Sequence, residues 1–160
     1  MRATGKGSLS SILAVGLHIT RIILIVATIG LAIALVVMPL ISIFSSHGSG
    51  SIDDYFDVSY SFIAALVMLF VVTRLLEILK TLRFGSPFVK ENADRFREVG
   101  YALLIGEGAK FVFSFFSLIF GADLDIEIEM IAWVAIIAVF VLSEVFREGA
   151  RMKEEQDLTV

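Results

Sequence analysis

The stretch that decides the fold is IILIVATIGLAIALVVMPLISIF, residues 22–44, which contains only two hydroxyl side chains and no charge. No Asp, Glu, Lys or Arg occurs between Ile22 and Ile52. A helix crosses the ~30 Å hydrocarbon layer of a bilayer with about 20 such residues. The stretch therefore predicts a retained membrane-spanning helix. A cleaved signal peptide has a much shorter apolar region, of about 7–15 residues.

Three further apolar stretches follow, each interrupted by few charges. Together with the first they predict helices at about 12–44, 60–82, 92–120 and 126–155. Hydrophobic residues make up 58% of the 160 residues and charged residues 19%, against about 45–50% and 25% in soluble chains. The predicted fold class is an all-α membrane protein, a single domain of residues 1–160 built as a four-helix bundle of transmembrane helices.

Composition also excludes several function classes. The net charge of −4 argues against a nucleic-acid-binding domain, and the absence of cysteine removes disulfides, thiolate nucleophiles and iron–sulfur clusters. No P-loop, HExxH, GxSxG or GxGxxG pattern is present. The two histidines, His18 and His47, flank opposite ends of the first helix, which is unsuitable for a haem ligand pair. We therefore expect no enzyme activity, no cofactor and no metal.

The basic residues predict how the chain is oriented. They gather before the first helix, between the second and third, and in the C-terminal tail, whereas residues 45–59 and 121–129 contain none. Lys and Arg accumulate in cytoplasmic segments, so we expect both termini and the middle loop in the cytoplasm. The two outer loops are acidic, which suits carboxylates near the positive ends of helix dipoles.

Four charged residues fall inside predicted spans: Arg74, Glu77, Glu107 and Lys110. Such groups are costly in lipid and usually face the protein interior in pairs. Counted from presumed helix ends at residues 82 and 99, Arg74 and Glu107 have equal depth, so we expect them to pair. Glu77 and Lys110 would then bond within their own helical turns. The alternatives are a structural ion pair and a proton or ion path.

The middle loop is GSPFVKENADRFREVG, residues 85–100. Gly85 can end a helix, and Ser-Pro suits the start of the next. Charged and apolar residues then alternate with helical spacing. This pattern predicts an amphipathic inner-loop helix between the second and third spans, lying on the membrane surface or continuing directly into the third helix.

Two motifs resemble a bacterial membrane family, domain of unknown function 2975. The inner-loop motif comprises Gly85, Pro87, Phe88, Asn92, Arg97 and Gly100, and the C-terminal motif comprises Phe146–Gly149 followed by Glu154, Glu155, Asp157 and Leu158. Members of this family are small four-helix membrane proteins with no established activity. They are often encoded beside a helix-turn-helix regulator. The resemblance implies a multi-pass protein of the bacterial inner membrane with such a regulator as its cytosolic partner.

These observations leave three hypotheses. The first is a non-enzymatic regulatory membrane protein that holds a cytosolic partner and does not itself bind nucleic acid. The second is a small transporter or channel that uses the intramembrane charges. The third is an accessory subunit of a larger membrane complex. Besides the lipid bilayer, a homo-oligomer or another membrane protein is a candidate partner, because small residues such as Gly16 and Gly30 on the first helix suit close packing or a dimer seam.

Overall fold

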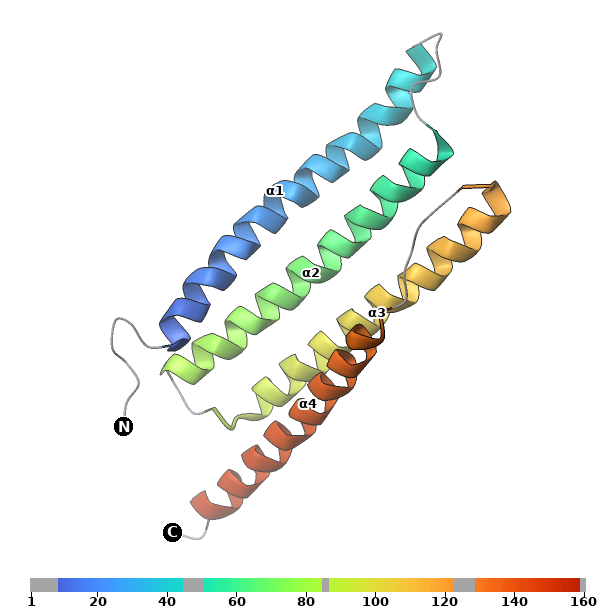
Figure 1. The fold of residues 1–160 in the computed structure, drawn as a ribbon. Coiled ribbons are helices and arrows are strands. Elements are labelled where there is room, and N and C mark those ends of the chain that lie inside the picture. The colour runs from blue at the N-terminus through green and yellow to red at the C-terminus, as the bar shows by residue number, and fades with distance from the viewer. Residues whose placement is uncertain (1–8, 45–50, 85–86, 123–128, 159–160) are drawn as a thin grey trace.

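The computed structural model describes residues 9–44, 51–84, 87–122 and 129–158. These segments form four helices, α1 (Leu9–Phe44), α2 (Ile52–Phe84), α3 (Lys90–Phe120) and α4 (Met130–Asp157) (Figure 1). Each helix is long and apolar enough to cross a membrane. At 36 residues, α1 is about 54 Å long at ~1.5 Å per residue, so it extends well beyond the hydrocarbon layer. The expected all-α membrane fold is confirmed.

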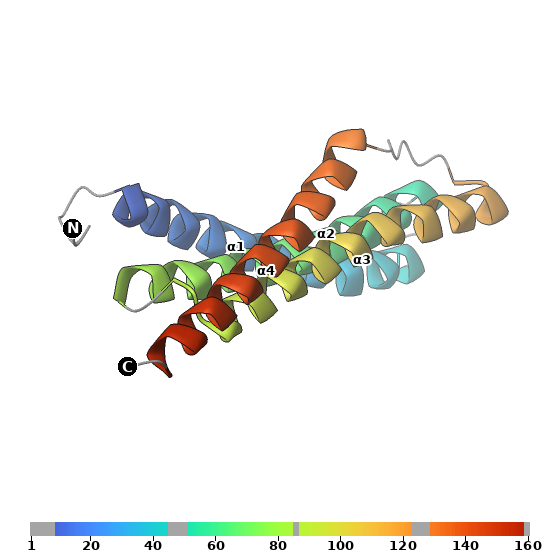
Figure 2. The same cartoon turned by 90° about the horizontal axis from the view of Figure 1, so that it is seen from below.

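The helices pack as an open row rather than as a closed bundle. Among the described residues, contacts link α1 with α2, α2 with α3, and α3 with α4 only. Figure 1 shows α1, α2 and α3 side by side, and Figure 2 shows α4 crossing over α3. Short connections make consecutive helices antiparallel neighbours, which explains the order of the row.

At one end of the row lie the start of α1, the end of α2, the start of α3 and the last turns of α4 (Figure 1). We call this the basic end, because Arg21, Arg74 and Arg95 lie toward it. The last turns of α4, residues 143–157, also lie there with their basic residues, and we call them the α4 extension. Both described chain ends, at residues 9 and 158, lie there.

The core lies between α2, α3 and α4. Val71 of α2 is buried against Val99 and Ala102 of α3, and Val139 of α4 packs against this cluster. By contrast, the most apolar part of α1 is not buried by the rest of the chain. A Cβ at Gly16 or Gly30 would meet nothing within 4 Å. Gly16 and Gly30 therefore do not mediate close packing within the described part of the chain.

The start of α2 differs from the expected residue 60 because of a local cap. The Ser51 hydroxyl accepts a hydrogen bond from the Asp54 amide at 3.2 Å, and the Asp54 carboxylate accepts one from the Ser51 amide at 2.9 Å. This reciprocal arrangement satisfies free amides at a helix start. Asp53 and Asp54 occupy the first turn, where their charge favours the helix dipole. The helix therefore begins at Ile52, in polar sequence.

The separate inner-loop helix is not present in the described chain. Residues 90–100 instead form the first turns of α3, which runs without a break from Lys90 to Phe120. Val89 precedes it in an extended conformation. The amphipathic pattern arises because one side of these turns is buried against α2 and α4, with Asn92, Ala93 and Val99 among the buried residues. Of the two alternatives for this segment, continuation into the third span is the one observed.

Candidate functional site

The candidate residues gather in three places: a polar cluster between α2 and α3, an ion pair deeper in α3, and an aromatic contact between α3 and α4. The polar cluster and the aromatic contact lie at the basic end. The cluster combines two arginines with two glutamates that belong to neighbouring helices. Each place contains residues of a sequence motif or charged residues that the sequence places within the membrane.

The polar cluster is centred on Glu77 of α2. One of its carboxylate oxygens lies 2.8 Å from Arg74 Nη1 and 3.2 Å from Arg95 Nε. Arg74 Nε also approaches Glu98 Oε2 to 2.7 Å, although not along the N–H direction, so this contact is an ion pair without a directed hydrogen bond. The cluster therefore bridges α2 and the first turns of α3 by charge.

Asn92 anchors the same junction from inside. Its side chain is fully buried, at 0% exposure. The amide nitrogen donates to the Pro87 carbonyl at 3.0 Å, and the amide oxygen accepts from Arg95 at 2.9 Å. The Thr81 hydroxyl also lies 2.8 Å from that oxygen. Asn92 thus ties α2, the connecting segment and α3 together, which gives the inner-loop motif a structural role.

The expected pairing of Arg74 with Glu107 is wrong. Arg74 contacts Glu77 and Glu98, and Glu107 contacts Lys110. The error came from taking residue 99 as the inner end of the third helix, whereas α3 begins nine residues earlier, at Lys90. That shift moves the level of Arg74 from Glu107 to Glu98. The two bonds expected within single turns, Arg74–Glu77 and Glu107–Lys110, are confirmed.

The Glu107–Lys110 pair lies near the middle of α3. Lys110 Nζ is 2.9 Å from Glu107 Oε1, and the two side chains are only 16% and 11% exposed. The second carboxylate oxygen of Glu107 is buried, and no hydrogen-bond donor reaches it within the described part of the chain. A cavity of about 180 Å³ adjoins the pair between α2 and α3, with Tyr60 and Val67 on its α2 wall.

The two sequence motifs meet in an aromatic contact. Phe88 and Phe96 both pack on Phe146 of α4, with ring centroids 5.5 and 4.9 Å apart. Gly149 leaves room for the Phe88 ring, because a Cβ at that position would overlap it. One turn away, the Ser143 hydroxyl donates to the Ala93 carbonyl at 2.8 Å. The start of α3 and the extension of α4 therefore form one unit.

Gly100, which closes the inner-loop motif, has a packing role. A Cβ there would lie 2.9 Å from the ring of Phe140, so only glycine lets α3 and α4 approach this closely. Arg97 instead faces outward and pairs with Asp94 at 2.9 Å. Gly85 lies outside the described residues. The motif thus mixes packing residues with an exposed charge.

The tail residues Glu154, Glu155 and Leu158 of the C-terminal motif are exposed. Glu155 pairs with Arg151 at 3.1 Å within α4, and Leu158 is 87% exposed. Asp157 is the last residue of α4. Glu154 lines a groove of about 250 Å³ between the start of α3 and the end of α4. Phe88, Lys90, Glu91 and Lys153 also line this groove.

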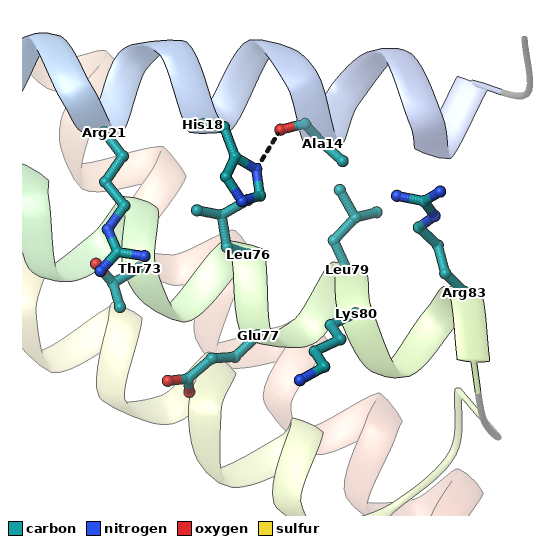
Figure 3. Close-up of a pocket in the computed structure, with 9 residues that line it drawn as sticks. All are labelled: Ala14, His18, Arg21, Thr73, Leu76, Glu77, Leu79, Lys80 and Arg83. Atoms are coloured by element: carbon teal, nitrogen blue, oxygen red, sulfur yellow. Dashed lines mark hydrogen bonds between the residues drawn. The ribbon is translucent and has the colours of Figure 1, made fainter. Parts of the chain in front are cut away.

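A further pocket, of about 420 Å³, lies between α1 and α2 at the basic end (Figure 3). It was not predicted from the sequence. Its lining includes His18, Arg21 and Arg83. His18 Nδ1 donates to the Ala14 carbonyl at 2.8 Å, so this side chain is held by its own helix. The available signal was the position of Arg21 and Arg83, which border the apolar parts of two consecutive helices.

Comparison with known proteins gives one match. No curated protein and no solved structure matches the chain. A family model described as a protein of unknown function, DUF2975, matches residues 54–160. The matched segment covers α2 from residue 54 onward, α3 and α4, with the polar cluster and both motifs. Since the match covers more than half of the chain, this multi-pass membrane protein belongs to the DUF2975 family.

Proposed function

We propose that this protein is a non-enzymatic regulator of the bacterial inner membrane, whose basic end faces the cytoplasm and holds a cytosolic partner. The partner class is a helix-turn-helix transcription regulator, as the family resemblance implies. The observation that carries the proposal is the meeting of both motifs at one end. Residues that are distant in sequence form one unit there, and its surface has a groove.

The orientation is supported by the basic residues. The described lysines and arginines other than Lys110 lie toward the basic end, and Arg2 and Lys6 precede α1 in sequence. Membrane insertion retains such residues in the cytoplasm. The groove is then exposed to cytosolic proteins.

The groove has a chemistry suited to a folded partner. Lys90 and Lys153 place positive charge beside Glu91 and Glu154, while Phe88 supplies apolar surface. Mixed charges around an apolar contact favour specificity in protein recognition. The groove does not contain the dense positive charge that nucleic acid requires. We therefore assign DNA contact to the partner and not to this chain.

A binding experiment tests the proposal. The full chain is placed in vesicles, a helix-turn-helix regulator of the kind that the family resemblance implies is added, and its capture is measured by co-sedimentation. Lys153→Glu, which reverses a charge in the groove, should weaken capture several-fold, as should deletion of residues 154–160. Glu144→Lys is the matched charge-reversal control, since Glu144 is exposed on the same helix, belongs to neither motif and does not line the groove. Equal capture by all four proteins would contradict the proposal.

A second candidate function, transfer of a proton or small cation, is favoured by one observation. The buried Glu107 oxygen has no hydrogen-bond donor among the described residues and lies beside the cavity between α2 and α3. Intramembrane carboxylates of this kind mark ion pathways in many membrane proteins. In proteoliposomes, a flux abolished by Glu107→Gln and unaffected by Glu155→Gln would establish this function. Absence of flux in the unmodified protein would eliminate it.

A further inference from the structure

We propose that the pocket between α1 and α2 at the basic end binds the phosphate group of an anionic phospholipid. This inference is independent of the regulatory role proposed above, because α1 makes no contact with α3 or α4 in the described part of the chain. Three features carry it: the depth of the pocket in the membrane, its charge, and the direction of its side chains.

The depth of the pocket follows from the charge-free segments. The long uncharged stretch of α1 starts directly after Arg21, and the uncharged part of α2 ends at Thr73. Figure 3 shows the Arg21 guanidinium beside Thr73, so both helices leave the hydrocarbon layer at the same level. The pocket continues along α2 to Arg83, about 15 Å further at ~1.5 Å per residue. Its Arg21 end therefore lies in the headgroup layer, where lipid phosphates lie, and its Arg83 end extends toward the aqueous side.

The pocket carries an excess of positive charge. Arg21, Lys80 and Arg83 line it, and Glu77 is its one acidic residue. The Glu77 carboxylate is already held by Arg74 and Arg95, neither of which lines the pocket. No carboxylate lies within ion-pair distance of Arg21 in the described segments. An anion bound at Arg21 would therefore offset an excess of positive charge.

The side chains are directed at the space between the helices. Figure 3 shows Arg21 and His18 pointing from α1 toward α2, and Arg83 pointing from α2 toward α1. Arg21 lies at the level of the hydrocarbon boundary, and Arg83 lies at the end of the pocket that is farther from the bilayer centre. This arrangement suits a lipid phosphate near Arg21, with its polar headgroup extending outward toward Arg83. A guanidinium provides two parallel donors for phosphate oxygens.

The same chemistry would accept a soluble phosphate, but two observations favour a lipid. The Arg21 end of the pocket lies at the boundary of the hydrocarbon layer, and Ile22 and Ile23, which follow it on α1, are about three-fifths exposed. This exposed aliphatic surface begins directly after Arg21 in the sequence and suits acyl chains. Basic pockets between transmembrane helices on the cytoplasmic side are known to hold anionic lipid headgroups.

The test measures lipid binding to the full-length protein in detergent by native mass spectrometry. Phosphatidylglycerol is the anionic probe, phosphatidylcholine is the zwitterionic reference, and inorganic phosphate is the soluble probe. We expect phosphatidylglycerol to bind in preference to phosphatidylcholine. The double variant Arg21→Gln/Arg83→Gln should lose about tenfold in affinity for phosphatidylglycerol, which corresponds to about 1.4 kcal/mol.

Two further variants control for charge and for folding. Arg147→Gln/Arg151→Gln removes two exposed arginines of α4, outside the pocket, and should leave the preference unchanged. Arg21→Lys/Arg83→Lys keeps the charge and should retain most of the binding. Equal binding of both lipids, or equal loss in the Arg147/Arg151 variant, would overturn the proposal. If inorganic phosphate saturates the pocket and phosphatidylglycerol does not compete with it, the bound phosphate group does not come from a lipid, and the proposal of a lipid ligand is overturned.

Discussion

Gly149→Ala tests the contact that joins the two motifs. The new Cβ would overlap the Phe88 ring, including the ring atom nearest the backbone, so Phe88 must leave Phe146 or the α4 extension must shift. Overpacking of this kind costs about 1–3 kcal/mol. Replacing glycine with alanine inside a helix contributes about 0.5–1 kcal/mol in the opposite direction. We therefore expect a net loss of up to about 2.5 kcal/mol.

Gly16→Ala is the matched control. Gly16 also lies in a helix near the basic end, but a Cβ there would meet nothing within 4 Å. Only the helix-propensity gain remains, so this variant should be more stable by about 0.5–1 kcal/mol. The two variants should therefore differ by about 1–3 kcal/mol. At ~2–4 °C per kcal/mol for a chain of this length, their thermal midpoints should differ by about 2–12 °C.

The assay is thermal unfolding in detergent, followed by circular dichroism. Adding Phe88→Ala to Gly149→Ala removes the overlap, so the double variant should lose less stability than the two single changes added together, with a coupling of about 0.5–3 kcal/mol. Gly149→Ala as stable as Gly16→Ala, or strict additivity with Phe88→Ala, would refute the reasoning.

Two further predictions concern buried polar groups. Lys110→Met leaves the Glu107 carboxylate without its cation and should lower the free energy of unfolding by about 3–5 kcal/mol. In a double-variant cycle of thermal stability, adding Glu107→Leu should restore part of this loss. The losses from Arg74→Leu and Glu107→Leu should be additive within about 0.5 kcal/mol. Asn92→Ala deprives the Pro87 carbonyl and Arg95 of a buried partner and should lower the free energy of unfolding by about 2–4 kcal/mol. Proteolysis between α2 and α3 should also become faster. The control Asp94→Ala removes only an exposed ion pair and should cost less than about 1 kcal/mol.

The sequence was sufficient to predict the membrane helices, because uncharged stretches such as residues 22–44 have no other stable location. It placed helix ends poorly where polar residues continue a helix. The Ser51–Asp54 cap at the start of α2 depends on hydrogen bonds that a hydropathy pattern does not report. At α3, the Ser-Pro signal at residues 86–87 lay close to the observed start at Lys90, and a depth count from Lys90 matches Arg74 with Glu98.

The joint between the motifs could not be predicted from periodicity. Phe88 and Gly149 are distant in sequence, and their contact depends on the angle at which α4 crosses α3 (Figure 2). That angle is permitted by Gly100 opposite Phe140, a long-range relation that hydrophobic patterning does not encode. The pocket between α1 and α2 was missed for a related reason, since Arg21 and Arg83 gain a shared role only when the helices are side by side.

The central claim is that the end bearing both motifs faces the cytoplasm. The chain contains no cysteine, so Lys153→Cys and Ser49→Cys each introduce a single thiol for labelling with a membrane-impermeant maleimide. In intact bacterial cells whose outer membrane admits the reagent, we predict labelling of the Ser49→Cys protein only, and labelling of the Lys153→Cys protein after the inner membrane is permeabilised. Labelling of Lys153→Cys in intact cells would contradict the account.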